Sequence, residues 1–364
     1  MRVTDAAQQA WPPFVLVTGL LLIGIVAHTD GLFDRAGRRL ERLPGPPAVL
    51  FAGGVLVVVV VTAVLNLDTA VVFLTPVLVL AARRRKVDER PFLYAAVFMA
   101  NASSLYLPGS NLTNLLVLAH NPASGGTFAA DLLVPALTAT LTTAAALSLL
   151  FASSLRGKAR PGPDAPRLAR KPIAAPPSGF RLPWLGALAA LAAAGLTVAM
   201  RNPAVPVLAV GVSAVAIEVI AGRLVVRSVI TAVGPAVLVT LFLVSVALGV
   251  LARSWDGPAQ LLSGAGRWET AAIGSLTAIL VNNLPAAALL SARAAPHPRA
   301  LLIGLNLGPN LAVTGSLCAY LWIRAGRQVG ADPSIRTFSR YGIPLATAAI
   351  IAALAASSLL STPS

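Results

Sequence analysis

The feature that most constrains this chain is a pair of long apolar runs, each broken by polar residues. Asn66, Asp68 and Thr69 interrupt the run over residues 48–82, and Asn282 and Asn283 interrupt a later run in a similar way. A carboxylate or an amide is costly in hydrocarbon, and two broken apolar segments at corresponding places in two halves are typical of a carrier's binding site. The sequence therefore indicates a polar site inside a membrane.

The composition supports an integral membrane protein. Of the 364 residues, 57% are hydrophobic and 11% are charged, whereas about 25% of residues are charged in a soluble domain. The net charge of +15 comes from basic residues in loops between apolar runs. This pattern sets orientation in a bilayer, and we do not expect a nucleic-acid partner.

Cysteine and histidine usage argues against metal or disulfide chemistry. The single cysteine, Cys318, and three scattered histidines predict no disulfide, no metal site and no cofactor. We expect Cys318 to be a small packing residue. No nucleophile–base pair is visible, so an enzyme is not expected. The first apolar run, residues 14–27, lacks the basic leader and the cleavage site of a signal peptide.

The predicted fold class is an all-α polytopic membrane protein with about 8 full spans plus two re-entrant hairpins, because a span needs about 20 residues. Residues 46–82 are too long for one span, and basic residues flank both ends. We therefore expect a hairpin that enters and leaves on the cytoplasmic side. A second hairpin, 268–294, opens outside, which predicts two inverted-topology repeats, the architecture of alternating-access carriers.

The domain organisation follows from these segments. Residues 1–151 form the first membrane repeat, with a broken span at 91–119, and residues 229–364 form the second, with a broken span at 299–323. Between the repeats lie a basic, proline-rich cytoplasmic linker, 152–183, and a connecting helix pair, 184–228. We expect a multi-pass protein of the bacterial plasma membrane.

Asp68 is the leading candidate for a coupling group because it is the only acidic residue near the centre of an apolar run. Burial disfavours the charged form of a carboxylate, which suits proton coupling, and the same anion could instead coordinate sodium. The alternative is a structural helix cap. Glu218 lies shortly before Arg223, and we expect a boundary salt bridge there.

The neutral polar residues at the breaks are candidate solute ligands. Their amides and hydroxyls can bind a hydroxylated or oxyanionic solute, or can instead satisfy backbone groups freed at the breaks. These candidates are Asn66, Thr69, Ser110, Asn111, Asn282, Asn283 and Asn310.

Four stretches resemble the arsenite efflux permeases (the arsenical pump membrane protein family) of the ion transporter superfamily, which also includes divalent-anion/sodium symporters. They are Thr62–Pro76, Asn101–Asn114, Ala278–Ala286 and Gly304–Ser316. The resemblance covers nearly the whole chain. Family members carry further apolar segments before the stretch that matches Phe14–His28, so we expect one or two scaffold helices of the family to be missing here.

The resemblance implies a carrier that exports arsenite or antimonite, driven by proton entry or by a cytoplasmic ATPase partner, and it is compatible with a homodimer. No Lys or Arg lies in the four breaks, which favours a neutral inorganic solute such as arsenite. The alternatives are a sodium-coupled small-anion (dicarboxylate-type) symporter, a sodium/proton antiporter, and a channel-like or non-transporting scaffold. Broken helices in inverted register argue against the last class.

Overall fold

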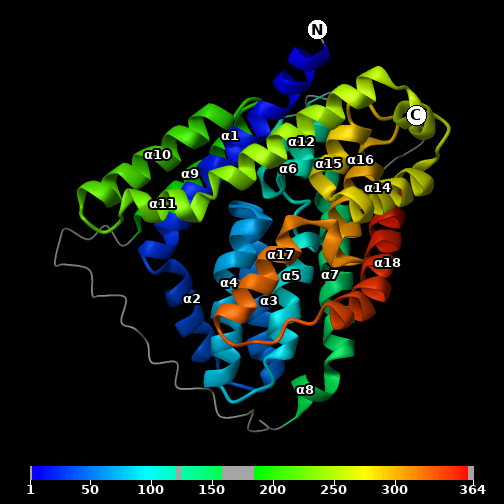
Figure 1. The fold of residues 1–364 in the computed structure, drawn as a ribbon. Helices are drawn as coiled ribbons and strands as arrows, with labels where there is room; N and C mark the ends of the chain where they lie inside the picture. The colour runs from blue at the N-terminus through cyan, green and yellow to red at the C-terminus, as the bar shows by residue number, and fades with distance from the viewer. Residues whose placement is uncertain (1, 120–123, 158–183, 360–364) are drawn as a thin grey trace.

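The computed structural model describes residues 2–119, 124–157 and 184–359, and every regular element within them is a helix (Figure 1). The predicted linker therefore lies almost wholly outside the described residues. The first half comprises α1 (Arg2–Thr29), α2 (Leu32–Glu41), α3 (Pro47–Val64), α4 (Leu67–Arg84), α5 (Arg90–Ala102), η1 (Pro108–Ser110), α6 (Leu112–Leu118), α7 (Gly125–Leu150) and α8 (Ala152–Arg156).

The second part begins with the helix pair α9 (Leu185–Ala199) and α10 (Ala204–Ile220). The remaining elements are α11 (Val226–Val233), α12 (Pro235–Ser254), α13 (Gly257–Ser263), α14 (Arg267–Val281), α15 (Asn283–Leu290), α16 (Pro298–Leu307), η2 (Gly308–Asn310), η3 (Val313–Gly315), α17 (Leu317–Gln328) and α18 (Ile335–Leu359). The all-α fold class is therefore confirmed.

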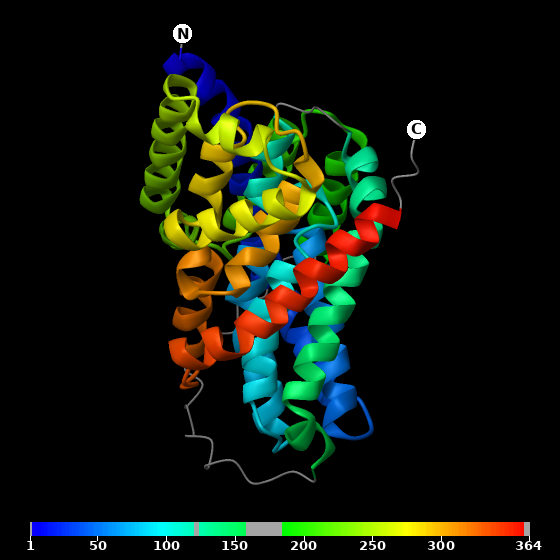
Figure 2. The same ribbon diagram turned by 90° about the vertical axis from the view of Figure 1, so that its right-hand side faces the viewer.

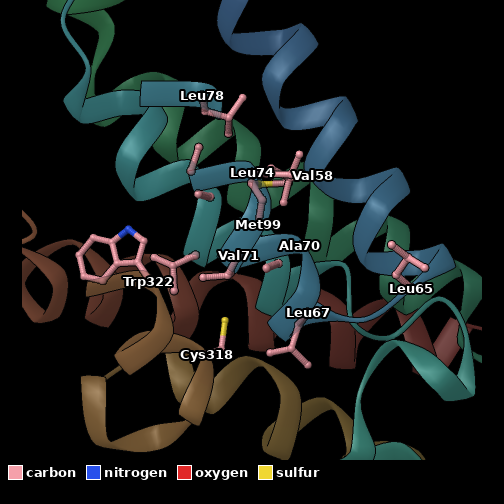
Figure 3. Packing of buried hydrophobic residues seen from close by; sticks show 14 of the residues in the cluster. Val58, Leu65, Leu67, Ala70, Val71, Leu74, Leu78, Met99, Cys318 and Trp322 are labelled. Carbon is pink, nitrogen blue, oxygen red and sulfur yellow. The ribbon is translucent and has the colours of Figure 1, made fainter. Parts of the chain in front are cut away.

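Each half contains a helical hairpin followed by a broken helix, and the two halves pack across each other. Hairpin arm α4 packs on α17 of the second half, and arm α15 packs on α6 of the first half. Figure 3 shows the α4 side of this exchange, where Leu67 and Val71 lie beside Cys318 and Trp322 of α17. Cys318 is fully buried there. In each half, this packing brings the hairpin tip close to the broken helix of the other half.

The longer helices outside the hairpins and broken helices pack closely against their neighbours. Helices α7 and α18 pack along each other (Figure 2), and α1 packs against α9, α10 and α12. Close approach depends on glycine in several places. A Cβ on Gly304 of α16 would lie 2.2 Å from the carbonyl oxygen of Ala271 in α14, which leaves no room for any side chain.

Loops assigned to the same side of the membrane by their charge contact each other. At the predicted cytoplasmic end, Arg85 donates to the carbonyl of Gly45 at 2.9 Å and Arg83 donates to that of Gly330 at 3.0 Å. At the other end, Arg299 pairs with Asp131 at 2.9 Å. The structure thus gathers the two sets of loops at opposite ends, as the charge pattern requires.

Five described helices are long and apolar enough to cross a membrane, namely those within 3–29, 47–64, 125–150, 226–254 and 335–358. Each arm of the first hairpin has 18 residues, which corresponds to roughly 27 Å at the usual helical rise. These arms are longer than half of a membrane span of about 20 residues. The re-entrant interpretation, like the number of spans, stays a prediction.

The close contact between α14 and α16 generates a stability prediction. We expect Gly304→Ala to lower the free energy of unfolding by about 1–3 kcal/mol, because the methyl group forces the two helices apart. The matched control is Gly195→Ala in α9, where an added Cβ meets nothing within 4 Å; this variant should be neutral or slightly stabilising. Thermal unfolding in detergent measures both, and equal midpoints would contradict the prediction.

Candidate functional site

The two hairpin tips and the two broken helices surround one cavity of about 790 Å³. Residues from all four breaks line it: Leu67, Asp68, Thr69, Asn111, Leu112, Asn282, Asn283, Leu284, Ser316 and Leu317. Helices α1, α11 and α12 complete the wall, with Val17, Ile25 and Leu238 among the apolar lining residues. The polar groups of the four breaks, which are far apart in the sequence, therefore share one space.

The breaks present the beginnings of helices to the cavity. Asn66, Asn111, Asn282 and Ser316 are the residues that immediately precede α4, α6, α15 and α17. The first N–H groups of a helix have no partner within that helix, and the helix dipole places partial positive charge at this end. The cavity wall is therefore suited to oxygen atoms that accept hydrogen bonds.

Asp68 brings the only carboxylate to the described cavity lining. It lies in the first turn of α4 and is half-buried. Within the described residues, its carboxylate makes no hydrogen bond within 3.5 Å and no ion pair within 4.0 Å to a protein group. The helix-cap alternative is not supported, because the Oδ1 atom of Asn66 fills that position and accepts a hydrogen bond from Thr69 N at 2.7 Å.

Five of the predicted site residues line the cavity, and three do not. Asp68, Thr69, Asn111, Asn282 and Asn283 belong to the lining. Asn66, Ser110 and Asn310 are buried behind it and bond to the protein itself.

The three residues behind the wall have structural partners. Asn66 caps α4. Ser110 donates to the carbonyl of Ala63 at 3.3 Å and so ties the first broken helix to the first hairpin. Asn310 accepts a hydrogen bond from Asn101 at 2.8 Å and donates to the carbonyl of Phe98 at 3.1 Å. We expected solute contacts here, but these side chains hold the breaks together.

Ser316 takes the place in the cavity that we expected for Asn310. The second break is long, since η2 and η3 both precede α17, and the chain reaches the cavity only at Ser316. The hydroxyls of Ser316 and Thr69 are buried without a hydrogen-bond partner in the protein. Ser316 lies within the motif 304–316, which contains several polar residues. What distinguishes Ser316 is that it immediately precedes α17.

The sequence-based selection also missed Asn306, which is the centre of a buried amide network. Its Oδ1 accepts hydrogen bonds from Ser104 Oγ at 2.6 Å and from Asn111 Nδ2 at 2.8 Å. Its Nδ2 donates to Asn114 Oδ1 at 2.8 Å. The network joins the two broken helices. The signal in the sequence is an asparagine inside the apolar segment 298–307.

The tip of the second hairpin carries backbone strain. Asn282 has φ = 77° and ψ = 148°, a combination that is normally restricted to glycine and costs of order 1–3 kcal/mol. The strained residue turns the chain between α14 and α15, and its side chain accepts a hydrogen bond from Leu284 N at 3.4 Å. A tight turn at this point brings Asn282 and Asn283 to the cavity.

The cavity reaches the surface on the side that the charge pattern assigns to the cytoplasm. Its lining there includes Arg227, Arg324 and Gln328, all of which are exposed. These arginines lie outside the four breaks. The described inner part of the cavity, which the breaks form, therefore has no basic side chain, whereas the mouth has two. As for metals, no group of three His, Cys, Asp or Glu side chains comes together in the described part of the chain.

The network around Asn306 generates a second prediction. We expect Asn306→Leu to lower the free energy of unfolding by at least about 2 kcal/mol, because several buried polar partners lose their bonds at once. Asn202→Ala, at an exposed asparagine, is the control and should change it by less than about 0.5 kcal/mol. Chemical or thermal unfolding in detergent measures the difference, and a neutral Asn306→Leu would show that the network is dispensable.

Comparisons with known proteins agree with a carrier architecture. A family model described as "CitMHS: Citrate transporter" matches residues 3–319. The arsenical pump membrane protein of Escherichia coli strain K12 is 26% identical over 377 residues, covering 96% of this chain and 86% of that protein. A second Escherichia coli protein of the same name is 27% identical over 380 residues. The resemblance to arsenical pump proteins is therefore confirmed along nearly the whole chain.

Among solved structures, the YdaH transporter of Alcanivorax borkumensis, whose topology is described as unusual, shares the fold. Its TM-score is 0.56 at 13% sequence identity, and the match covers 99% of this chain and 87% of that one. The apolar helices and these similarities identify a multi-pass transporter of the bacterial plasma membrane. The chain belongs to the CitMHS family, described as citrate transporters.

Proposed function

We propose that this protein is a secondary active carrier that exports arsenite or antimonite by alternating access, with Asp68 as the proton-coupling group. The observation that carries the proposal is the position of Asp68, the single carboxylate in the described lining of a cavity that all four chain breaks share. A carrier needs one group whose charge changes with the coupling ion and which lies in the solute's own space. Asp68 meets both conditions.

The chemistry of the cavity suits a small hydroxylated solute. Arsenite is an uncharged trihydroxy species at neutral pH, so it offers both donors and acceptors. The hydroxyls of Thr69 and Ser316 are buried at the cavity wall without a protein partner, the amide of Asn283 belongs to the lining, and the helix beginnings supply N–H donors. The arsenical pump relatives in Escherichia coli support this choice of solute.

Coupling follows from the charge of Asp68. With Asp68 ionised, its carboxylate accepts hydrogen bonds from the hydroxyl groups of the solute, and loading occurs from the cytoplasm, the side to which the cavity opens. Protonation of Asp68 from the outside removes its negative charge and converts one of its oxygens into a donor, which weakens these hydrogen bonds and releases the solute. Each cycle thereby exchanges an inward proton for an outward solute, and the proton gradient alone supplies the energy without an ATPase.

The architecture that we propose for this cycle is a pair of inverted repeats, residues 1–151 and 229–364, with the hairpins re-entrant from opposite sides. The exchange of contacts between α4 and α17 and between α15 and α6 supports it, because corresponding elements of the two halves make corresponding contacts. The helix pair α9–α10 then belongs to neither repeat and packs on α1.

A second candidate is a carrier of a small carboxylate anion, coupled to sodium or to protons. Two observations favour it: Arg227 and Arg324 at the cavity mouth, and the family description of citrate transporters. In this function Asp68 would be a sodium ligand or a proton carrier, and the helix beginnings would bind the carboxylate groups. A sodium/proton antiporter would use the same residue without the arginines.

Transport into everted vesicles tests the lead proposal. Wild-type protein should accumulate labelled arsenite when the vesicle interior is acidified, without ATP, and Asp68→Asn should reduce this accumulation to the level of protein-free vesicles. Glu269→Gln, which removes an exposed carboxylate outside the cavity, is the matched control and should transport normally. Full, pH-dependent transport by Asp68→Asn would reject the coupling role.

Arg324→Gln separates the two candidates. If the solute is neutral, this substitution should leave the apparent affinity for arsenite within about twofold, since a neutral solute gains little from a distant exposed charge. If the solute is a carboxylate anion, the substitution should weaken its uptake by roughly fivefold or more at low salt, and added salt should shrink the effect. Citrate and arsenite uptake are measured side by side with and without sodium.

A further inference from the structure

A second group of charged side chains is buried away from the cavity, where the cytoplasmic ends of α1, α9 and α10 meet. It consists of Asp30, Glu218 and Arg223, whose side chains are 1%, 0% and 8% exposed. Arg223 Nη2 donates to Glu218 Oε1 at 2.6 Å, and its Nη1 lies 3.9 Å from Asp30 Oδ1. The boundary salt bridge expected between Glu218 and Arg223 is therefore confirmed, but a second carboxylate shares the same guanidinium.

The helices around these charges pack too closely for the side chains to turn outward. A Cβ on Gly186 at the start of α9 would lie 2.3 Å from Ala27 Cα of α1. One on Gly211 of α10 would lie 2.6 Å from the carbonyl oxygen of Gly19 in α1. The same approach lets Gly186 N donate to Asp30 Oδ2 at 2.7 Å. The glycine contacts therefore hold α9 and α10 close to α1, and Gly186 bonds Asp30 directly.

The charge of this cluster does not balance. Two carboxylates and one guanidinium give a formal charge of −1 in a buried position, which is costly unless a further cation joins. The polar atoms are also incompletely paired: two acceptors, Asp30 Oδ1 and Glu218 Oε2, and one donor, Arg223 Nε, are buried without a hydrogen-bond partner. The partnered oxygens, Asp30 Oδ2 and Glu218 Oε1, already accept hydrogen bonds from Gly186 and Arg223.

We propose that Asp30 and Glu218 share one bound proton, which makes this cluster a second proton-binding site separate from Asp68. A single proton neutralises the excess charge and turns one unpartnered carboxylate oxygen into a hydrogen-bond donor. A sodium ion fits poorly, because it needs about six oxygen ligands at short distance and would lie beside the guanidinium of Arg223. The site is independent of the identity of the transported solute.

Of the other described charged groups nearby, none is buried with the cluster. Arg35 of α2 donates to the main-chain carbonyl of Asp30 at 2.8 Å and stacks over Trp184 at 5.3 Å, so it is engaged beside the cluster while half-exposed. His28 of α1, Asp34 of α2 and Arg227 of α11 are exposed to solvent. Helix α9 carries no ionisable side chain, and α10 carries only Glu218.

The bound proton would fasten α1 to α9 and α10. Loss of the proton leaves two carboxylates repelling each other around one arginine, and the cytoplasmic end of this three-helix unit loosens. Because Ile25, one turn before Asp30, lines the central cavity, the packing of the cavity wall would then depend on cytoplasmic pH. The chemical class of the ligand is thus a proton, and its effect is on the rigidity of the helices that frame the transport site.

The experiment uses the full-length protein in detergent with Asp68→Asn as background, so that Asp68 does not contribute. We expect infrared difference spectra at neutral pH to show the C=O stretch of a protonated carboxylic acid, and Glu218→Gln added to this background to abolish it. Isosteric Glu269→Gln is the control and should retain the band. If the background protein lacks the band, or if it persists in the Glu218→Gln variant, the shared proton is excluded.

Stability gives a second measurement that does not rely on the spectrum. The folded background protein binds one proton more than the unfolded chain, whose Asp and Glu are ionised at neutral pH. Its unfolding equilibrium constant should therefore rise by up to roughly tenfold per pH unit while the folded cluster keeps the proton, and should level off once the folded cluster loses it. Glu218→Gln should flatten this dependence and Glu269→Gln should not. Equal pH dependence in all three proteins would overturn the proposal.

Discussion

The central physical constraint in this structure is the treatment of backbone groups where helices stop inside an apolar molecule. A helix that begins in the interior leaves its first N–H groups without partners in that helix, and the surrounding apolar side chains offer none. The chain places asparagine before three of these helices, and each side-chain oxygen accepts a hydrogen bond from the first turn. The fourth start, at Ser316, lacks such a side-chain bond. The interruptions can therefore exist at depth without unravelling the flanking helices.

This constraint divides the buried polar groups into two sets with different tasks. One set bonds only to the protein: the amides of Asn101, Asn306 and Asn310 join the two broken helices across the halves. The other set, including Asp68 and the hydroxyls of Thr69 and Ser316, lines the cavity and keeps bonding capacity for a solute. The first set fixes the geometry that the second set needs, because a binding group must be held by its own supporting contacts.

The charged groups of the cavity, its mouth and the buried cluster also differ in their surroundings. Among the described lining residues, the one carboxylate, that of Asp68, shares the cavity with four helix beginnings, so negative charge and partial positive charge occupy one space. At the mouth the arginines are exposed, where water screens them. The cluster of Asp30, Glu218 and Arg223 differs from both, because it is buried within a glycine-packed helix unit and is not part of the cavity lining. Asp68, the arginines at the cavity mouth and the buried cluster therefore lie in three different electrostatic environments.

The sequence by itself determined the all-α membrane fold and the places where the helices break, and it singled out Asp68 as a candidate, because hydrophobic length and polar interruptions are local properties of the chain. It could not decide which polar residue at each break faces the cavity. Asn310 and Ser316 are both near the second break, and only the two short 3₁₀ turns before α17 place Ser316 in the lining. Asn306 and Asp30 likewise gained their roles from contacts with residues far away in the chain. Tertiary structure decided these points because the direction of a side chain at a helix break depends on the packing of neighbouring helices, which no local pattern records.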